Sequence, residues 1–262
     1  MDLARLLLLF STLAFIGGLV QAVVMLRAGA WRESRWHLLP MALGFTFQCA
    51  FLYLRGQAHG RCPLTNLFEV FIFIGWCIVL LYFLVGTTYR LSLLGVFTAP
   101  LVALLQTMAL LSPLDTPVGP VVAGHVNPWR ELHATVALVA YAAFALACIT
   151  GVMFLLQDHL LKRHRVHALF HQLPPISHLS KAIVRMVTLG VVLLAVAMGC
   201  TFQLGLPITH AKLLFSWGVL GLYSVILALM WLRALGARPT AWLAVLGFLL
   251  PFISLWIVTP KP

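Results

Sequence analysis

The chain has 262 residues, of which 62% are apolar and only 9% are charged, and its mean hydropathy is +1.03. A soluble domain carries roughly 45–50% apolar and about 25% charged residues, so this composition excludes a water-soluble globule, a disordered chain and a disulfide-rich secreted scaffold. The formal net charge of +11 is expected to orient loops at a lipid bilayer, and we expect no nucleic-acid partner.

Apolar runs recur along the whole chain, and a membrane span needs about 20 apolar residues. In chain order the predicted spans are Leu6–Leu26, Leu38–Leu54, Leu67–Val85, Leu91–Leu111, Leu132–Leu156, Ala182–Phe202, Leu213–Leu232 and Trp242–Val258. The first is expected to be a span and not a signal peptide, because it is long and is followed by Arg27, Arg32 and Arg35. The sequence therefore predicts an all-α polytopic membrane protein, a bundle of about eight transmembrane helices in one domain over residues 1–262. The Pro- and Gly-rich loop near Pro120 is where a division would fall.

The basic residues of the loops are distributed unequally between the two sides of this bundle. Asp115 and Glu131 partly offset those assigned to the outside, which are fewer: Arg55, Arg61, Arg130 and Lys212. The larger group follows the first, third, fifth and seventh spans: Arg27, Arg32, Arg35, Arg90, Lys162, Arg163, Arg165, Lys181, Arg185, Arg233 and Arg238. The positive-inside rule places these loops inside, so we expect both termini on the outer side.

Two histidines open predicted spans at the same expected depth on the outer side. His133 begins the fifth span and His210 begins the seventh. Neutral imidazoles from two helices at one level can ligate a metal, and haem iron accepts nitrogen ligands of this kind. The alternative is that both are interfacial histidines that snorkel to the surface or cap a helix. The five cysteines form no CxxCH haem-attachment motif, so the chain is not itself a c-type cytochrome.

Other polar residues lie within or beside spans, where an ionisable group is costly and marks a candidate site. Glu69 begins the third span near Arg61, and the two either form an ion pair at the outer mouth or have a functional role. A carboxylate at this place can also fix a histidine tautomer. Gln48 and Gln106 fall inside the second and fourth spans, where we expect them to form interhelical hydrogen bonds.

Three segments stand out when they are taken together in this order: Cys62–Trp76, Asn127–Arg163 and Leu173–Gly199. They resemble the CcsA-like cytochrome c assembly proteins, and the resemblance covers most of the chain from about Gly60 onward. The second segment includes the histidine that opens a helix of this family, here His133. In the first segment the matching positions are Pro63, Asn66, Glu69 and Trp76.

The resemblance implies that the protein handles haem b for cytochrome c maturation at the outer face of the plasma (inner) membrane. Its partners would be haem and another cytochrome c assembly membrane protein or apocytochrome c. His133 and His210 would be the axial ligands. Glu69 and Arg61 would hold a ligating histidine or contact a haem propionate. Arg130 would be another propionate partner, and Trp129 would cover the haem edge.

The sequence also departs from the full CcsA pattern. Between Thr201 and Trp217 it lacks the family's Trp-rich loop, and no late external histidine precedes Pro262. The histidine near the inner end of the family's seventh helix is not matched either. The shorter HemX-like and YpjD-like relatives also lack the loop and are more similar. This implies no synthetase activity for the chain on its own, and we predict no catalytic residues.

Two other classes of function stay open at this stage. One is a cofactor-free regulatory or structural membrane subunit, as the HemX-like relatives permit, in which the histidine pair binds nothing. The other, ranked third, is a small permease with a polar path along broken helices. Pro100 and Pro251 could break spans, but Gln48 and Gln106 alone offer little polar material for such a path.

Overall fold

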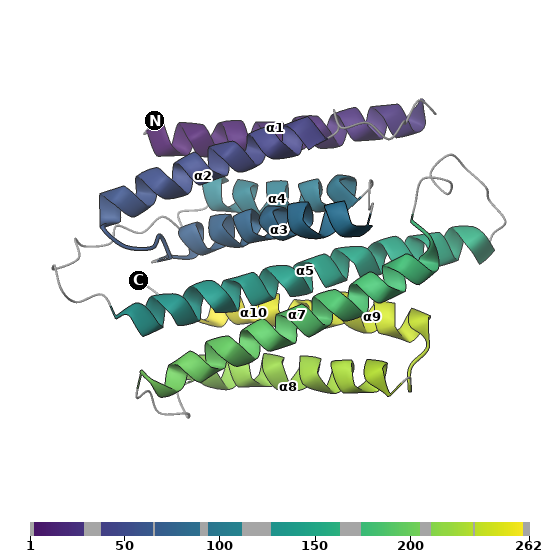
Figure 1. Cartoon of the computed structure of the whole chain (residues 1–262). Helices are drawn as coiled ribbons and strands as arrows, with labels where there is room; N and C mark the ends of the chain where they lie inside the picture. The colour runs from purple at the N-terminus through teal and green to yellow at the C-terminus, as the bar shows by residue number, and fades with distance from the viewer. Residues whose placement is uncertain are drawn as a thin grey trace. The chain divides into compact units, whose positions relative to one another are not determined.

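The computed structural model describes residues 3–28, 38–64, 66–89, 94–111, 127–162, 174–204, 211–232 and 234–258 (Figure 1). Its elements in this part of the chain are α-helices, and none of the described residues forms a strand. The helices are α1 (Leu3–Arg27), α2 (Leu39–His59), α3 (Leu67–Tyr89), α4 (Leu94–Leu111), α5 (Pro128–Lys162), α7 (Ile176–Phe202), α8 (Ala211–Trp231), α9 (Ala237–Gly247) and α10 (Leu249–Val258).

Seven helical segments among the described residues are long and apolar enough to cross a membrane. Seven of the predicted spans coincide with them, and the last comprises α9 and most of α10. The predicted span Leu38–Leu54 corresponds to α2, which has 21 residues and is less apolar, because its last turns carry Arg55 and His59. The protein is therefore a polytopic α-helical membrane protein, as predicted. The orientation of its termini stays a prediction.

Several helices extend beyond the apolar runs that predicted them. The second was expected to end at Leu54 and continues to His59, so Arg55 lies in the helix and not in a loop. The fifth was expected over Leu132–Leu156, whereas α5 has 35 residues and is about 52 Å long at 1.5 Å per residue. A hydrocarbon core is about 30 Å thick, so an apolar run marks only the part of such a helix that lies in lipid.

The last span is interrupted between α9 and α10, which lie nearly end to end in Figure 1. Pro251 explains the break, because proline has no N–H and its ring clashes with the carbonyl four residues earlier, here that of Gly247. Pro100 behaves differently, since α4 runs through it without interruption. Of the two prolines named for a permease path, only Pro251 accompanies a break in its helix.

The chain folds into two compact units, which we describe separately. The first comprises Met1–Val121 with His159–Pro174, and the second Val122–Asp158 with Pro175–Pro262. The prediction of one domain over the whole chain stays a prediction.

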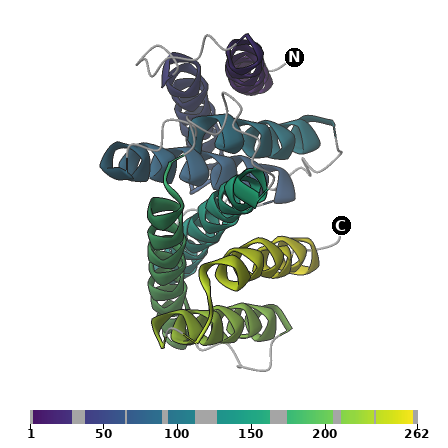
Figure 2. The ribbon, with the colours of Figure 1, turned by 90° about the vertical axis from the view of Figure 1, so that its right-hand side faces the viewer.

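In the first unit α1 packs against α2 and α4, and α3 packs against α4 (Figure 2). A buried polar network joins α1, α2 and α4. Gln106 Nε2 donates to Ser11 Oγ at 3.1 Å, and Ser11 Oγ donates to the Gly44 carbonyl at 2.8 Å. Thr12 Oγ1 lies 2.9 Å from Gln106 Oε1. The interhelical hydrogen bonds predicted for Gln106 are thereby confirmed, and both the oxygen and the nitrogen of its buried amide have partners.

In the second unit an aromatic pair forms the core between α5 and α8. The rings of Phe144 and Tyr223 are stacked with centroids 3.7 Å apart, and both side chains are fully buried. Gly190 of α7 faces the same Phe144 ring, and a Cβ added there would overlap ring atom Cε1. The absent side chain at Gly190 therefore leaves room for the Phe144 ring against α7.

We predict that Gly190→Ala destabilises the protein, because the new methyl group overlaps the Phe144 ring, which is fully buried and stacked on Tyr223. Overpacking of this kind costs about 1–3 kcal/mol. The melting temperature of the detergent-purified variant measures it. Gly199→Ala in the same helix is the control, since no neighbouring atom of the described residues lies within 4 Å of its Cβ position. Equal melting temperatures for the two variants would contradict the packing described.

Candidate functional site

His133 lies in the second turn of α5, and the local sequence fixes where that helix starts. The Asn127 side-chain oxygen accepts a hydrogen bond from the backbone N–H of Trp129 at 3.0 Å, which is the usual role of an N-cap asparagine. Pro128 follows at the first helical position, where its missing N–H costs nothing. Glu131 adds a negative charge to the first turn, which the helix dipole favours. These residues set the register that places His133.

The ring of His133 is anchored to α7. Its Nδ1 lies 2.7 Å from the backbone carbonyl oxygen of Ala197, a residue that is fully buried. A carbonyl oxygen can only accept a hydrogen bond, so Nδ1 carries the proton. In the neutral ring Nε2 then holds the free lone pair, and His133 makes no other hydrogen bond with the described residues. Histidines that bind metals are oriented in this way by their second nitrogen.

The other residues predicted for the second unit are distributed as follows. Trp129 is 43% exposed, and Arg130 in the same first turn of α5 is also exposed. Both lie within about one turn of His133 along the helix. His210, the predicted second ligand, lies outside the described residues. The structure therefore places one histidine of the pair and two neighbours that could contact a ligand at the start of α5.

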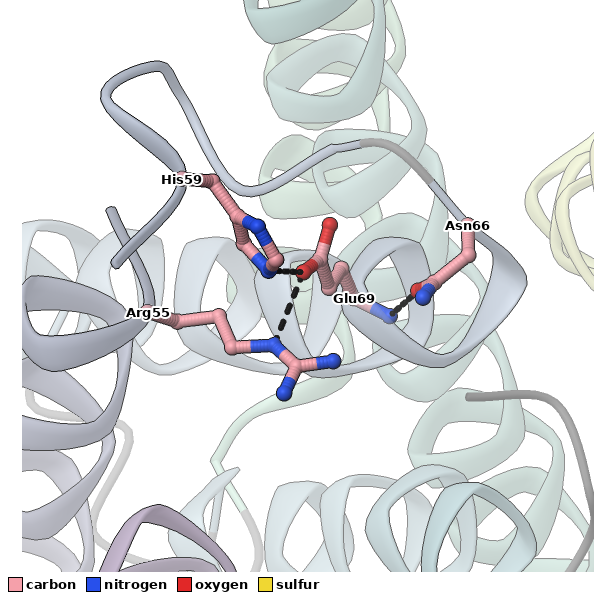
Figure 3. Close-up of polar contacts among 4 residues, drawn as sticks. All are labelled: Arg55, His59, Asn66 and Glu69. Atoms are coloured by element: carbon pink, nitrogen blue, oxygen red, sulfur yellow. Dashed lines mark hydrogen bonds and ion pairs between the residues drawn. The ribbon is translucent and has the colours of Figure 1, made fainter. Parts of the chain in front are cut away.

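Glu69 forms a separate buried cluster in the first unit, shown in Figure 3. Its side chain is fully buried, and Arg55 Nε donates to Glu69 Oε1 at 2.9 Å. His59 Nε2 lies 3.4 Å from the same oxygen. The Asn66 side-chain oxygen accepts the backbone N–H of Glu69 at 2.9 Å and so caps the start of α3. The Arg55 guanidinium also lies over the Phe68 ring, 5.5 Å from its centroid.

This cluster differs from the pairing that the sequence suggested. Arg61 was expected beside Glu69, whereas the structure pairs Glu69 with Arg55 and His59. The Nε of Arg61 is buried and has no hydrogen-bond partner among the described residues. Sequence reasoning assigned Arg55 to a loop and did not consider His59. The spacing of four residues between Arg55 and His59 could have indicated that both side chains reach the same group, because residues four apart lie on one face of a helix.

A bare metal ion and a haem iron require different numbers of protein ligands. No group of three or more His, Cys, Asp or Glu side chains among the described residues could hold a metal ion. A haem iron needs only axial ligands from the protein, since the porphyrin nitrogens occupy its other positions. The fixed ring and free Nε2 of His133 meet the requirement for one axial ligand. Haem therefore fits the donor set better than a bare metal ion does.

Comparison with protein families gives a match to the cytochrome c assembly protein model over residues 64–259, more than half of the 262-residue chain. The chain belongs to the cytochrome c assembly protein family. The match includes α3 with Glu69 and α5 with His133. The membership agrees with the resemblance found in the sequence, and it implies haem handling in general terms. Neither the type of haem nor its ligands follow from it.

Individual relatives of this cytochrome c assembly protein fall into two groups. CcsA of Chlorella vulgaris is 34% identical over 106 residues, which cover 40% of this chain and 34% of that protein. CcsA of Synechococcus sp. (strain JA-3-3Ab) is 33% identical over 135 residues, covering 49% and 39%. HemX of Bacillus subtilis is 24% identical over 224 residues, covering 83% and 81%. The chain thus spans only about a third of the length of the CcsA relatives and most of HemX.

We predict that Glu69→Gln destabilises the protein, because Arg55 and His59 lose the negative charge between them. Removing one partner of a fully buried ion pair costs about 3–5 kcal/mol. Arg55 is 20% exposed, so we expect a smaller loss here, about 1–3 kcal/mol. Thermal melting in detergent measures it.

Arg238→Gln is the control for that measurement. It removes the partner of Asp158 in an ion pair of 3.6 Å whose arginine is 60% exposed. Exposed pairs contribute about 0–1 kcal/mol, so its melting temperature should stay close to that of the unmodified protein. A Glu69→Gln protein as stable as the Arg238→Gln protein would mean that the buried cluster is not a stabilising element.

Proposed function

We propose that this membrane protein binds haem and presents it for cytochrome c assembly, with Nε2 of His133 as an axial ligand. The observation that carries the proposal is the 2.7 Å contact between His133 Nδ1 and the Ala197 carbonyl. In the neutral ring that contact leaves the lone pair on the other nitrogen, and it holds the ring in one orientation before any ligand arrives. A preoriented ligand loses little conformational entropy on binding.

The second axial ligand in this proposal is His210, which precedes α8 in the sequence. A neutral His pair binds ferric and ferrous haem without adding charge, which suits a protein that must also release its cargo. Arg130 is the proposed partner of a haem propionate, because a guanidinium binds a carboxylate through two parallel hydrogen bonds. Trp129 would cover the haem edge. In the first unit Arg61 and Glu69 stay proposed partners of a propionate and of a histidine, respectively.

The role proposed for the protein is to bind and orient haem and not to catalyse bond formation. The cargo contributes the vinyl groups that a c-type cytochrome finally bonds to its cysteines. Among the described residues the outer start of α5 offers an imidazole, an indole and a guanidinium, and none of these is a nucleophile poised beside a base. A partner membrane protein would therefore hold the apocytochrome. We place this activity at the outer face of the plasma membrane and take haem b as the cargo.

Absorption spectra of the detergent-purified protein, oxidised and reduced, test the proposal. We expect a low-spin haem signal, either as purified or after haem is added. Both His133→Ala and His210→Ala should weaken the signal or convert it to a high-spin form, because each removes one of the two strong-field ligands. His178→Ala is the matched control, since His178 is an exposed histidine near the start of α7 and should leave the spectrum unchanged.

The outcomes separate the proposal from its rivals. Unmodified protein that neither contains haem nor takes it up would exclude the haem carrier and favour a cofactor-free membrane subunit. A spectrum that persists unchanged in His133→Ala would exclude this ligand. If His133→Ala fails to fold, His133→Gly supplied with free imidazole tests the same point. Imidazole should restore the low-spin signal, because it can occupy the space left by the side chain.

A further inference from the structure

Gln48 has an unusual position for an amide in the first unit. Its side chain is fully buried in the middle of α2. Both Nε2 and Oε1 are buried atoms, and neither has a hydrogen-bond partner among the described residues. The interhelical bond expected from the sequence is therefore not formed to any of them. A buried amide without partners is costly, at about 1–3 kcal/mol for each group.

The neighbouring contacts hold Gln48 where it is. Trp76 Nε1 donates to Cys49 Sγ at 3.1 Å, which ties the next residue of α2 to α3. Two turns further along α2, Arg55 is bonded to Glu69 of α3. These two contacts, one and seven residues after Gln48 along α2, fix the register between α2 and α3. With this register fixed, α2 and α3 cannot slide along each other to bring the Gln48 amide to another partner.

The amide faces a glycine on α3. A Cβ added at Gly75 would lie 3.3 Å from Gln48 Nε2 and 3.4 Å from Val102 Cγ1, and no third atom of the described residues would be within 4 Å. Both distances are short, so a methyl group at Gly75 would press against the amide, and the glycine leaves this side of the amide without a side chain at position 75. Gln106 in the same unit is the counterexample, since Ser11 and Thr12 satisfy its amide directly.

We propose that an ordered water molecule binds Gln48 beside Gly75, as a structural part of the first unit. The ligand must both accept from Nε2 and donate to Oε1 within a small space, and water is the smallest molecule that does both. Buried waters in proteins typically make two to four hydrogen bonds to polar groups that would otherwise be unsatisfied. An apolar occupant such as a lipid chain would leave both amide atoms unpaired.

The site also connects with the rest of α2. Gln48, Arg55 and His59 are separated by seven and four residues and lie on one face of the helix. Phe51, which stands between them on this face, is fully buried and packs edge-on against Phe68 with centroids 5.9 Å apart. Along α2, the Phe51 and Phe68 rings therefore lie between the proposed water and the Glu69 cluster. The proposed water belongs to an internal site and not to an open channel.

Electron cryomicroscopy of the whole chain, bound to an antibody fragment and at a resolution that reveals waters, tests the proposal. In the unmodified protein we expect a density peak within about 2.7–3.2 Å of both Gln48 Nε2 and Oε1. The peak should be lost in Gln48→Met, which keeps the side-chain size but offers no partner. A map with clear density for Gln106 and no peak at Gln48 would overturn the proposal, as would a direct bond between the Gln48 amide and another protein group.

Melting temperatures give a second readout. We expect Gln48→Met to leave the melting temperature unchanged or lower it, because a satisfied amide is replaced. A rise would mean that the amide is dry and unpaired, and it would overturn the proposal. Gly75→Ala should lower the melting temperature and displace the peak, whereas Gly17→Ala in α1, with no atom of the described residues within 4 Å of its Cβ position, should do neither. If Gln48→Met fails to fold, the maps of the unmodified and Gly75→Ala proteins decide.

Discussion

The hydrogen bond from His133 Nδ1–H to the Ala197 carbonyl is the interaction on which the functional account depends. It joins the start of α5 to α7 and, in the neutral ring, fixes the tautomer and leaves the lone pair on Nε2. The capping by Asn127 and the start of the helix at Pro128 matter because they place His133 opposite that carbonyl. Without this bond the ring would be one more interfacial histidine with two interchangeable tautomers. With it, a single backbone oxygen sets the orientation of the ring and identifies Nε2 as the nitrogen that we propose for a ligand.

The polar residues of the first unit illustrate three ways in which a membrane protein satisfies buried polar groups. Gln106 finds direct partners on α1, and Glu69 finds Arg55 and His59 on α2 together with a capped helix start. Gln48 finds no partner among the described residues, and we assign it a water. The three cases follow from one constraint, because a group left unpaired away from bulk water costs several kcal/mol. The apolar surface facing lipid imposes no comparable demand, which is why the helices can expose so many large aliphatic side chains.

Hydropathy and loop composition were sufficient to predict the helical membrane fold and the approximate place of the spans. They did not predict the helix ends, since polar residues such as Arg55 and His59 continue a helix that an apolar run no longer marks. The break between α9 and α10 was foreseen only as a possible effect of Pro251. For the site, the sequence singled out His133 and Glu69, but the partners of both were missed. Ala197 contributes a backbone carbonyl, which no side-chain pattern can reveal, and Arg55 reaches Glu69 only because α2 and α3 pack together.

The central claim is that His133 binds iron through Nε2 while Nδ1 stays bonded to the backbone. A structure of the haem-loaded protein, at a resolution that separates the two ring nitrogens, tests it most directly. The account predicts iron within bonding distance of His133 Nε2, with the Nδ1 contact to the Ala197 carbonyl retained. Haem bound without His133, or bound through Nδ1 with the Ala197 contact broken, would contradict it.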